Sequence, residues 1–298
     1  MKHIYVSPHA DDVALSCGAQ ILANPHRRSD SLVITAFTSE QDSSKPAPTN
    51  DQARFVGSIH ADRDTEDAAA WDLAGVPLRA LGLPEALLRG RFPFSISRTA
   101  ADYQVMAELY SVITSYMQTY TGAKFYFPAG IGRHLDHLLC RDIGIDMLEK
   151  RASAKIVFYE DAPYWWLQFL RKANYRELGS RPVTNDTTHH SPQAGINLLQ
   201  YLLQKNVPFP RGRKLFSAVY AGLLAGAGRR SAIGLKSFYP TVTTTRFDQD
   251  ILAEKRQLVC QYKSQLPMLF GEAPGDLLKI YADCFATETT IELIQRPS

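Results

Sequence analysis

Residues 2–23 read KHIYVSPHADDVALSCGAQILA: a short apolar run, a polar turn and an amphipathic segment. Ile4 to Ser7 is apolar and β-branched and stops at Pro8, which is typical of a strand. Residues 11–23 carry apolar side chains at helical spacing. The two aspartates at their start suit the positive end of a helix dipole. The stretch therefore predicts a strand that leads through a polar turn into a helix.

The same alternation continues to about residue 162. Apolar runs predict further strands at 32–38, 77–83, 124–128 and 155–159. Segments with helical spacing predict helices at 59–73, 100–120 and 135–150, whereas 39–53 and 84–99 are polar and predict loops. Strands that alternate with helices indicate βαβ units joined by right-handed crossovers. We therefore expect an α/β fold with a parallel sheet.

Beyond residue 162 the pattern is less regular. Trp165, Trp166, Phe169 and Leu170 indicate an apolar helix, residues 241–247 a strand, and residues 248–264 a helix. We expect residues 1–162 to form the core domain, and residues 163–298 to complete that core and cap its pocket.

Composition excludes several classes of protein. The 298 residues carry 33 Lys+Arg against 30 Asp+Glu, a formal net charge of +3, and 45% are hydrophobic. These values lie in the globular range, and so weak a charge gives no case for nucleic acid as a partner. No apolar run is long enough for a membrane span or a signal peptide. The four cysteines contain no CxxC and are expected as free thiols, so we expect a cytoplasmic protein without a membrane partner.

The first chemically distinctive segment is residues 7–12, SPHADD, at the junction of the first predicted strand and helix. In open α/β sheets the carboxyl ends of the strands line the ligand crevice. One aspartate could simply cap the helix, but capping leaves the other aspartate and His9 unexplained. The segment is therefore a candidate site, with helix capping as the alternative interpretation.

A second polar turn, GIGRHLDH at 130–137, follows the strand predicted at 124–128. His134 and His137 are three residues apart, so they project to the same side of a helix or tight turn. A polar surface loop is the alternative. Both turns are expected at one edge of the sheet, where imidazoles and a carboxylate would suit a zinc-like ion with an open position for water. Such a metal lowers the pKa of the water, and a spare carboxylate can accept its proton.

Taken together, SPHADDVALSCG and GRHLDH resemble the LmbE-like, PIG-L-like family of N-acetylglucosaminyl de-N-acetylases. The family signature is a (P/A)HxDD box after the first strand and an HxxH box after a later one. Lesser similarities are RDTE at 63–66, EDAPY at 160–164, and Lys255 with YKSQ at 262–265. The similarity covers roughly residues 2–165 and 240–266.

The resemblance implies a Rossmann-like, mostly parallel sheet flanked by helices, with the catalytic core and metal site in residues 1–162. It implies a zinc-dependent N-deacetylase whose partner is a small amino sugar or its conjugate. By motif position it implies that His9, Asp12 and His137 bind one divalent ion, most commonly Zn²⁺. Asp11 would then be the general base.

By the same resemblance, His134 would stabilise the tetrahedral oxyanion or protonate the leaving amine, and Asp136 would orient that imidazole. Arg63 would contact substrate hydroxyls or a phosphate. One position departs from many members of the family, which have Glu where this chain has Val13. The departure puts the exact sugar in doubt and leaves the chemistry in place.

Alternative functions are a sugar- or metal-binding relative without turnover, and an amidohydrolase that acts on a non-acetyl amide. A dinucleotide-binding oxidoreductase would need a GxGxxG turn where this chain has PHADD. Cys140 is a minor candidate ligand, and His189 and His190 are expected in an exposed loop. The sequence leaves open whether the chain forms homo-oligomers.

Overall fold

The computed structural model describes residues 2–39, 51–95, 97–150, 154–162, 164, 168–179, 238–266 and 286–295. Within these ranges seven strands form one sheet in the order β3-β2-β1-β4-β5-β7-β6. Strands β3 to β5 in this order are parallel, whereas β7 is antiparallel to both β5 and β6. Their bounds are β1 His3–Ser7, β2 Ser31–Thr35, β3 Leu78–Ala80, β4 Lys124–Pro128, β5 Lys155–Tyr159, β6 Phe238–Arg246 and β7 Thr287–Gln295. The predicted α/β class with a mostly parallel sheet is confirmed.

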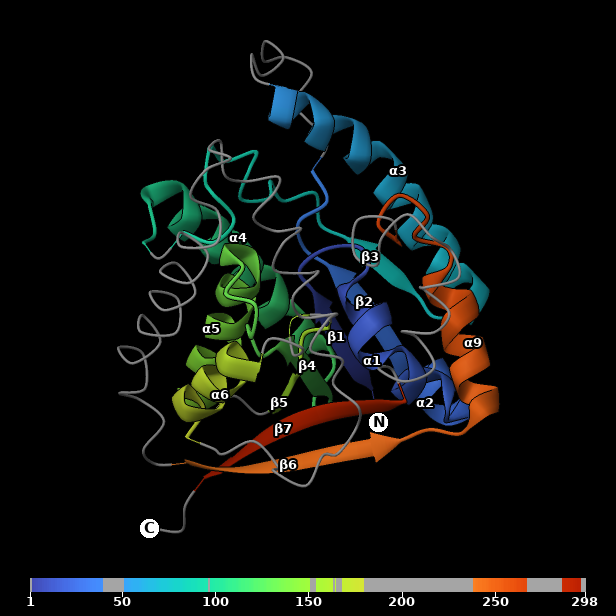
Figure 1. Cartoon of the computed structure of the whole chain (residues 1–298). Coiled ribbons are helices and arrows are strands. Elements are labelled where there is room, and N and C mark those ends of the chain that lie inside the picture. Colours follow the sequence, from blue (N-terminus) through green and yellow to red (C-terminus); the bar gives the residue numbers. More distant parts are fainter. Residues whose placement is uncertain are drawn as a thin grey trace.

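Helices cover both faces of this sheet (Figure 1). On one side lie α1, α2, α3 and α9, and on the other lie α4, α5 and α6. Their bounds are α1 Asp12–Leu22, α2 Pro25–Asp30, α3 Asp51–Ala74, α4 Ala100–Thr119, α5 Leu135–Glu149, α6 Gln168–Glu177 and α9 Gln249–Val259. Because β1 and β4 are adjacent and parallel, the turns that follow them emerge at the same edge.

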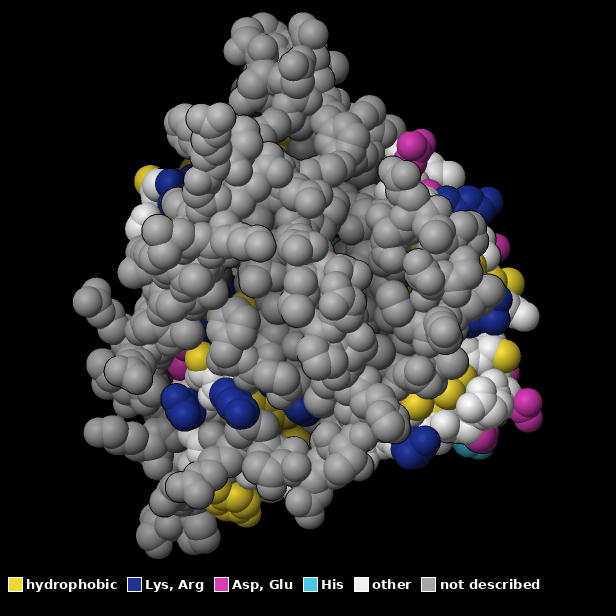
Figure 2. Space-filling view, in the orientation of Figure 1, with side chains coloured by type: hydrophobic (Ala, Val, Ile, Leu, Met, Phe, Trp, Pro, Cys, Tyr) yellow, Lys and Arg dark blue, Asp and Glu magenta, His cyan; other side chains and the backbone are white. Residues whose placement is uncertain are grey.

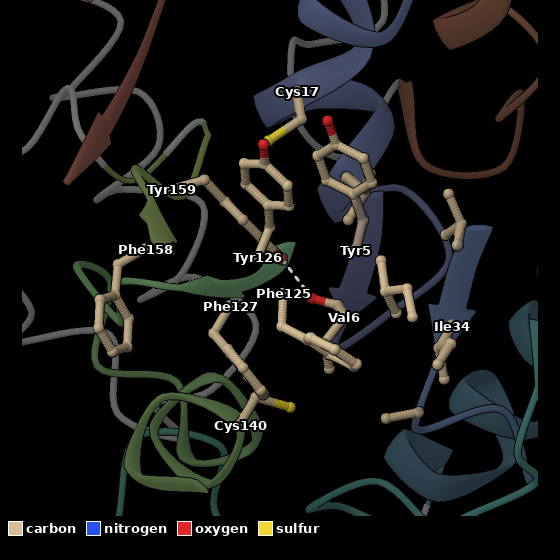
Figure 3. Packing of buried hydrophobic residues seen from close by; sticks show 14 of the residues in the cluster. Tyr5, Val6, Cys17, Ile34, Phe125, Tyr126, Phe127, Cys140, Phe158 and Tyr159 are labelled. Atoms are coloured by element: carbon tan, nitrogen blue, oxygen red, sulfur yellow. Dashed lines mark hydrogen bonds between the residues drawn. The ribbon is translucent and has the colours of Figure 1, made fainter. Parts of the chain in front are cut away.

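The core forms because successive residues of a strand point to opposite faces of the sheet. Tyr126 points toward α1 and Cys17, whereas its neighbour Phe127 points toward α5 and Cys140 (Figure 3). A Cβ added at Gly144 of α5 would lie 2.9 Å from the Phe127 ring, so this helix packs directly on the sheet. This tight packing fixes the distance of α5 from the sheet. Helix α5 begins directly after the polar turn at 130–134, so the packing also positions that turn.

The C-terminal part of the chain is joined to the first helix by a buried ion pair. Lys255 of α9 is fully buried and donates to Glu288 of β7 at 2.7 Å. Glu288 also accepts the backbone N–H groups of Ala19 and Gln20 at 2.8 and 2.7 Å. These bonds hold α9 and β7 against α1. Whether a domain boundary lies at residue 162 stays a prediction.

Three elements differ from the sequence prediction. Helix α3 begins at Asp51, inside the stretch predicted as a loop, and neither α2 nor β7 was predicted. Strand β7 was obscured because Glu288 and Thr289 are both buried polar residues, which breaks the alternation of a half-buried strand. The expected positions of Trp165, Trp166, His189 and His190 lie outside the described residues.

Surface charge is mixed where the described side chains are visible. Along the edge formed by α3 and α9, Lys and Arg alternate with Asp and Glu (Figure 2). None of the helices in the described ranges is both long enough and apolar enough to cross a bilayer.

Candidate metal centre and active site

The turn between β1 and α1 is held by its own side chains. The Ser7 hydroxyl donates to the His9 carbonyl at 2.6 Å and accepts the Val13 N–H at 3.2 Å. Asp12 accepts the backbone N–H of His9 at 2.8 Å. Asp11 stands at the N-cap position of α1, yet its side chain makes no capping bond. Capping therefore does not account for Asp11, which is buried at the edge of the sheet.

The turn between β4 and α5 brings the second motif to the same place. Gly130 has φ +75° and Arg133 has φ +62°. These left-handed residues let the chain turn sharply before His134, which is the N-cap of α5. The Asp161 carboxylate, just after β5, accepts the Ile131 N–H at 2.9 Å and fixes the middle of the turn.

The two turns place three imidazoles together. Among the described residues, His9, His134 and His137 form a group in which one ring nitrogen from each lies within 4.8 Å of the other two. The Asp12 carboxylate lies between two of them, with Oδ2 at 3.3 Å from His9 Nδ1 and 3.2 Å from His137 Nε2. Ligands about 2.0 Å from a tetrahedral zinc ion are about 3.3 Å apart. The spacing of Asp12, His9 and His137 therefore fits one small divalent ion.

The hydrogen bonds of these imidazoles also fit a metal. His9 Nε2 lies 3.1 Å from Asp136 and His137 Nδ1 lies 2.8 Å from Asp161, so each ring has one nitrogen on a buried carboxylate. Metal-binding histidines typically donate their other ring N–H to a carboxylate in this way. His137 Nε2 is buried and makes no well-aligned hydrogen bond, although Asp12 Oδ2 lies 3.2 Å from it. A cation bound by these two atoms would satisfy both.

Without a cation, protons stabilise the same cluster. Burial opposes a charged His137, but Asp12 and Asp161 outweigh it and raise the pKa of His137 to about 10. Asp12 is held well below its usual pKa, because the charged His137 and His9 overcome the cost of its burial. A divalent ion supplies positive charge to the same atoms, so metal and protons should compete for this site.

His134 has a different environment. Burial and the neighbouring His9 lower the pKa of His134 to about 3, so the ring is neutral at pH 7. Its Nδ1 accepts the Asp136 backbone N–H at 3.3 Å. In a neutral imidazole the other nitrogen then carries the hydrogen. His134 therefore presents an Nε2–H donor beside the proposed ion position.

Comparison with known proteins finds two relatives that are named as deacetylases. No protein-family model matches the chain. A 2'-N-acetylparomamine deacetylase of Niallia circulans is 27% identical over 226 residues, which are 67% of this chain and 80% of that enzyme. An enzyme of the same name from Streptomyces fradiae is 28% identical over 165 residues, 55% of this chain and 57% of that enzyme. Both relatives are named as deacetylases, which agrees with the resemblance of the motifs to the LmbE-like, PIG-L-like family.

Two solved structures of deacetylases share the fold of this chain. The zinc-inhibited form of teicoplanin deacetylase matches with a TM-score of 0.61 and 18% identity over the whole of both chains. A deacetylase of an antimicrobial pseudoaglycone matches with a TM-score of 0.60 and 18% identity, over all of this chain and 98% of that one. At these identities the likeness establishes the α/β fold and nothing finer.

The remaining predicted site residues lie close to the histidines. The Arg63 guanidinium lies 3.6 Å from Asp11 and 3.8 Å from Glu85. Glu66, which could have paired with Arg63, instead accepts two hydrogen bonds from Ser264 at 2.7 and 2.8 Å. Arg63 therefore faces the candidate site, and Glu66 joins α3 to the turn after α9.

The Asp136 carboxylate lies closer to His9 than to His134, whereas the family resemblance implied that it would orient His134. Its Oδ2 lies 3.1 Å from His9 Nε2 but 3.8 Å from His134 Nδ1. Asp136 also accepts from Ala86 N–H at 3.0 Å and from the Arg89 guanidinium at 2.8 Å. Its carboxylate orients His9, whereas its backbone N–H orients His134.

Sequence reasoning gave no site role to three residues whose side chains are buried here. Asp161 bonds to His137, Arg89 bonds to Asp136, and Glu85 lies 4.0 Å from His9 Nε2. Asp161 could have been found, because it follows a predicted strand at the same sheet edge as both motifs. Glu85 and Arg89 lie in a stretch predicted only as a loop, where no motif marks them.

Proposed function

We propose that the protein is a metal-dependent hydrolase that removes the N-acetyl group from an amino sugar or an amino-sugar conjugate. The observation that carries the proposal is the Asp12 carboxylate at ligand spacing from both His9 and His137, with each imidazole backed by a carboxylate. The names of the curated relatives, which are deacetylases of N-acetylparomamine, support the acetamide as the bond that is cleaved.

His9, Asp12 and His137 would hold one divalent ion, and a set of two nitrogens and one oxygen suits Zn²⁺. When bound, the ion supplies a Lewis acid that lowers the pKa of a water molecule and polarises the acetamide carbonyl. The buried Nε2 of His137, which lies 3.2 Å from Asp12 Oδ2 without a well-aligned hydrogen bond, supports this assignment. Because a solved structure of similar fold is described as a zinc-inhibited form, zinc should be compared with other divalent ions at one equivalent and in excess.

Two side chains would perform the proton chemistry. Asp11 is not needed to hold the ion, so its carboxylate can accept the proton of the attacking water. His134 can donate its Nε2–H to the carbonyl oxygen as negative charge develops there. A neutral imidazole with a lowered pKa favours this hydrogen-bond role for His134 over proton donation to the leaving amine. The proton that Asp11 accepts from the water would then pass to the nitrogen of the leaving amine as the C–N bond breaks.

The direct test is acetate release from a panel of acetylated amino sugars, free and conjugated, by the metal-loaded protein. Chelation should abolish release and re-addition of one equivalent of metal should restore it. Formyl and propionyl analogues in the same panel test the alternative of a non-acetyl amide. Sugar binding without acetate release under every metal would instead establish the non-catalytic alternative.

Arg63→Ala should raise KM by about 10-fold or more, since a guanidinium bond to an uncharged or anionic part of the substrate is worth about 1.5–3 kcal/mol. Arg63 also opposes the upward shift in the pKa of Asp11 caused by burial. Its removal should therefore move the acidic limb of the pH profile of kcat/KM to higher pH. Steady-state kinetics from pH 5 to 9 check both effects.

The matched control for this prediction is Arg256→Ala on the exposed surface of α9. It should leave KM and the pH profile unchanged. A fall in thermal stability of Arg63→Ala with unchanged KM would mean that Arg63 is only structural.

Four further expectations stay predictions: the cytoplasmic location, the lack of a nucleic-acid partner, the lack of a membrane partner, and the oligomeric state.

A further inference from the structure

Helix α6 ends on the turn that carries His134. Its last residue, Glu177, is 5% exposed. The Glu177 carboxylate accepts hydrogen bonds from both terminal nitrogens of the Arg133 guanidinium, one of them at 2.8 Å. The same carboxylate accepts a hydrogen bond from Arg141 of α5 at 2.9 Å. Arg133 directly precedes His134, and Arg141 lies about one helical turn after His137. One buried carboxylate therefore contacts both sides of the HLDH segment.

Arg133 is in a conformation that needs support. Its φ of +62° makes it the one non-glycine residue with positive φ in the described part of the chain. Left-handed backbone is unfavourable for residues with a Cβ, and it persists only when surrounding contacts hold it. The bidentate bond to Glu177 is such a contact, because two parallel bonds fix both the position and the plane of a guanidinium.

A second bond attaches α6 to the start of the same turn. Asn174 is fully buried, lies about one helical turn before Glu177, and donates its amide to the Ala129 carbonyl at 2.5 Å. Helix α6 is itself attached to the end of β5 by Glu160. This carboxylate accepts hydrogen bonds from Arg171 at 2.6 Å and from Tyr175 at 2.5 Å. Helix α6, which is fixed to β5, therefore contacts the turn near its start, at residue 129, and near its end, at residue 133.

We propose that Glu177 is a positioning residue that acts through Arg133 to hold His134 in place for the reaction. A buried carboxylate with two guanidiniums is often no more stabilising than apolar side chains of the same volume. The cluster is therefore better explained by its effect on the orientation of the turn that carries His134. The kinetic consequence rests on the proposed function, in which His134 contacts the developing oxyanion. The structural consequence, a turn that loosens without Glu177, does not.

Glu177→Gln should lower kcat of the folded, metal-loaded enzyme by about 10-fold to 100-fold, the range for a misplaced group. KM should change less than about 2-fold, because His134 acts mainly in the transition state. Amide hydrogen exchange of the peptide covering 130–137 should become faster. Glu149→Gln is the matched control, an exposed glutamate at the end of α5, and should change neither kcat nor the exchange of that peptide.

Arg133→Gly tests the same idea without leaving an unpaired guanidinium at position 133. Glycine accepts positive φ without strain, so this variant isolates the loss of the side-chain anchor. It should also lower kcat and speed exchange at 130–137. In the Arg133→Gly background, Glu177→Gln should cause little further loss of kcat, while it still lowers the melting temperature through Arg141.

Three results would overturn the proposal. One is an Arg133→Gly enzyme with wild-type kcat and wild-type exchange at 130–137. Another is a Glu177→Gln enzyme with a lower melting temperature but with wild-type kcat and wild-type exchange at 130–137. The third is a double variant in which the two losses of kcat multiply. If the wild-type protein cleaves no acetylated sugar, faster exchange at 130–137 in both variants would still support Glu177 as the anchor, and the failure would belong to the proposed function.

Discussion

Replacing Asp11 with asparagine should lower kcat by about 10²-fold to 10⁴-fold while the metal content stays full, because this is the usual contribution of a general base. Asparagine keeps the shape of the side chain and can hydrogen-bond water, but it cannot accept a proton. The structure separates Asp11 from metal binding, since Asp12 fills the position between His9 and His137. Elemental analysis and single-turnover kinetics on the same sample measure the two properties.

The pH profile provides a second readout for Asp11. Burial raises the pKa of this carboxyl, and Arg63, 3.6 Å away, opposes the shift. A base works only when ionised, so kcat/KM of the wild type should fall as pH drops through that pKa. In Asp11→Asn this dependence should disappear. Asp250→Asn, an exposed aspartate in the first turn of α9, is the matched control and should behave as wild type.

Two outcomes would contradict the role of Asp11. Loss of metal from Asp11→Asn would make Asp11 a ligand and exchange the roles of the two aspartates. Near wild-type kcat with the metal retained would mean that another residue accepts the proton. Glu85 would then be the first to examine, because it is buried and lies 4.0 Å from His9.

The sheet edge that carries the site could be predicted because its signals are local. The run at 4–7 and the run at 124–128 are short, apolar and followed by polar turns, and each motif directly follows its strand. The order of βαβ units then places both turns at one edge by a general rule of parallel sheets. His9 and His137 were therefore assigned to one cluster although 128 positions separate them.

Contacts that join distant parts of the chain could not be read in this way. Strand β7 pairs with β5 across more than 130 residues, and its buried Glu288 makes it look less apolar than it is. The role of Arg89 depends on Asp136, 47 positions later. Nothing in a single sequence indicates which carboxylate a buried arginine meets. The orientation of Asp136 toward His9 likewise follows from packing, whereas the family resemblance implied His134.

The other large effect is expected at the ligands. His137→Ala and His9→Ala should each lose stoichiometric metal and activity together, because the remaining two protein ligands hold zinc far more weakly. Asp161→Asn should be intermediate, with metal affinity about 10-fold to 100-fold lower, since it removes the carboxylate that fixes the His137 ring. His26→Ala, an exposed histidine of α2, is the control and should keep both properties. Full metal content in His9→Ala and His137→Ala would contradict the site.

His134→Ala decides which three residues form the ligand set. One nitrogen from each of the three imidazoles lies within 4.8 Å of the other two, but His134 Nδ1 already accepts the Asp136 N–H. Asp12 is at ligand spacing from both other rings. We therefore expect His134→Ala to keep its metal and to lose kcat by about 10²-fold to 10³-fold, the usual effect of removing an oxyanion donor. Asp12→Ala should lose the metal. The reverse pattern, with metal lost from His134→Ala and retained by Asp12→Ala, would make the three histidines the ligands and leave Asp12 as the group that accepts the proton.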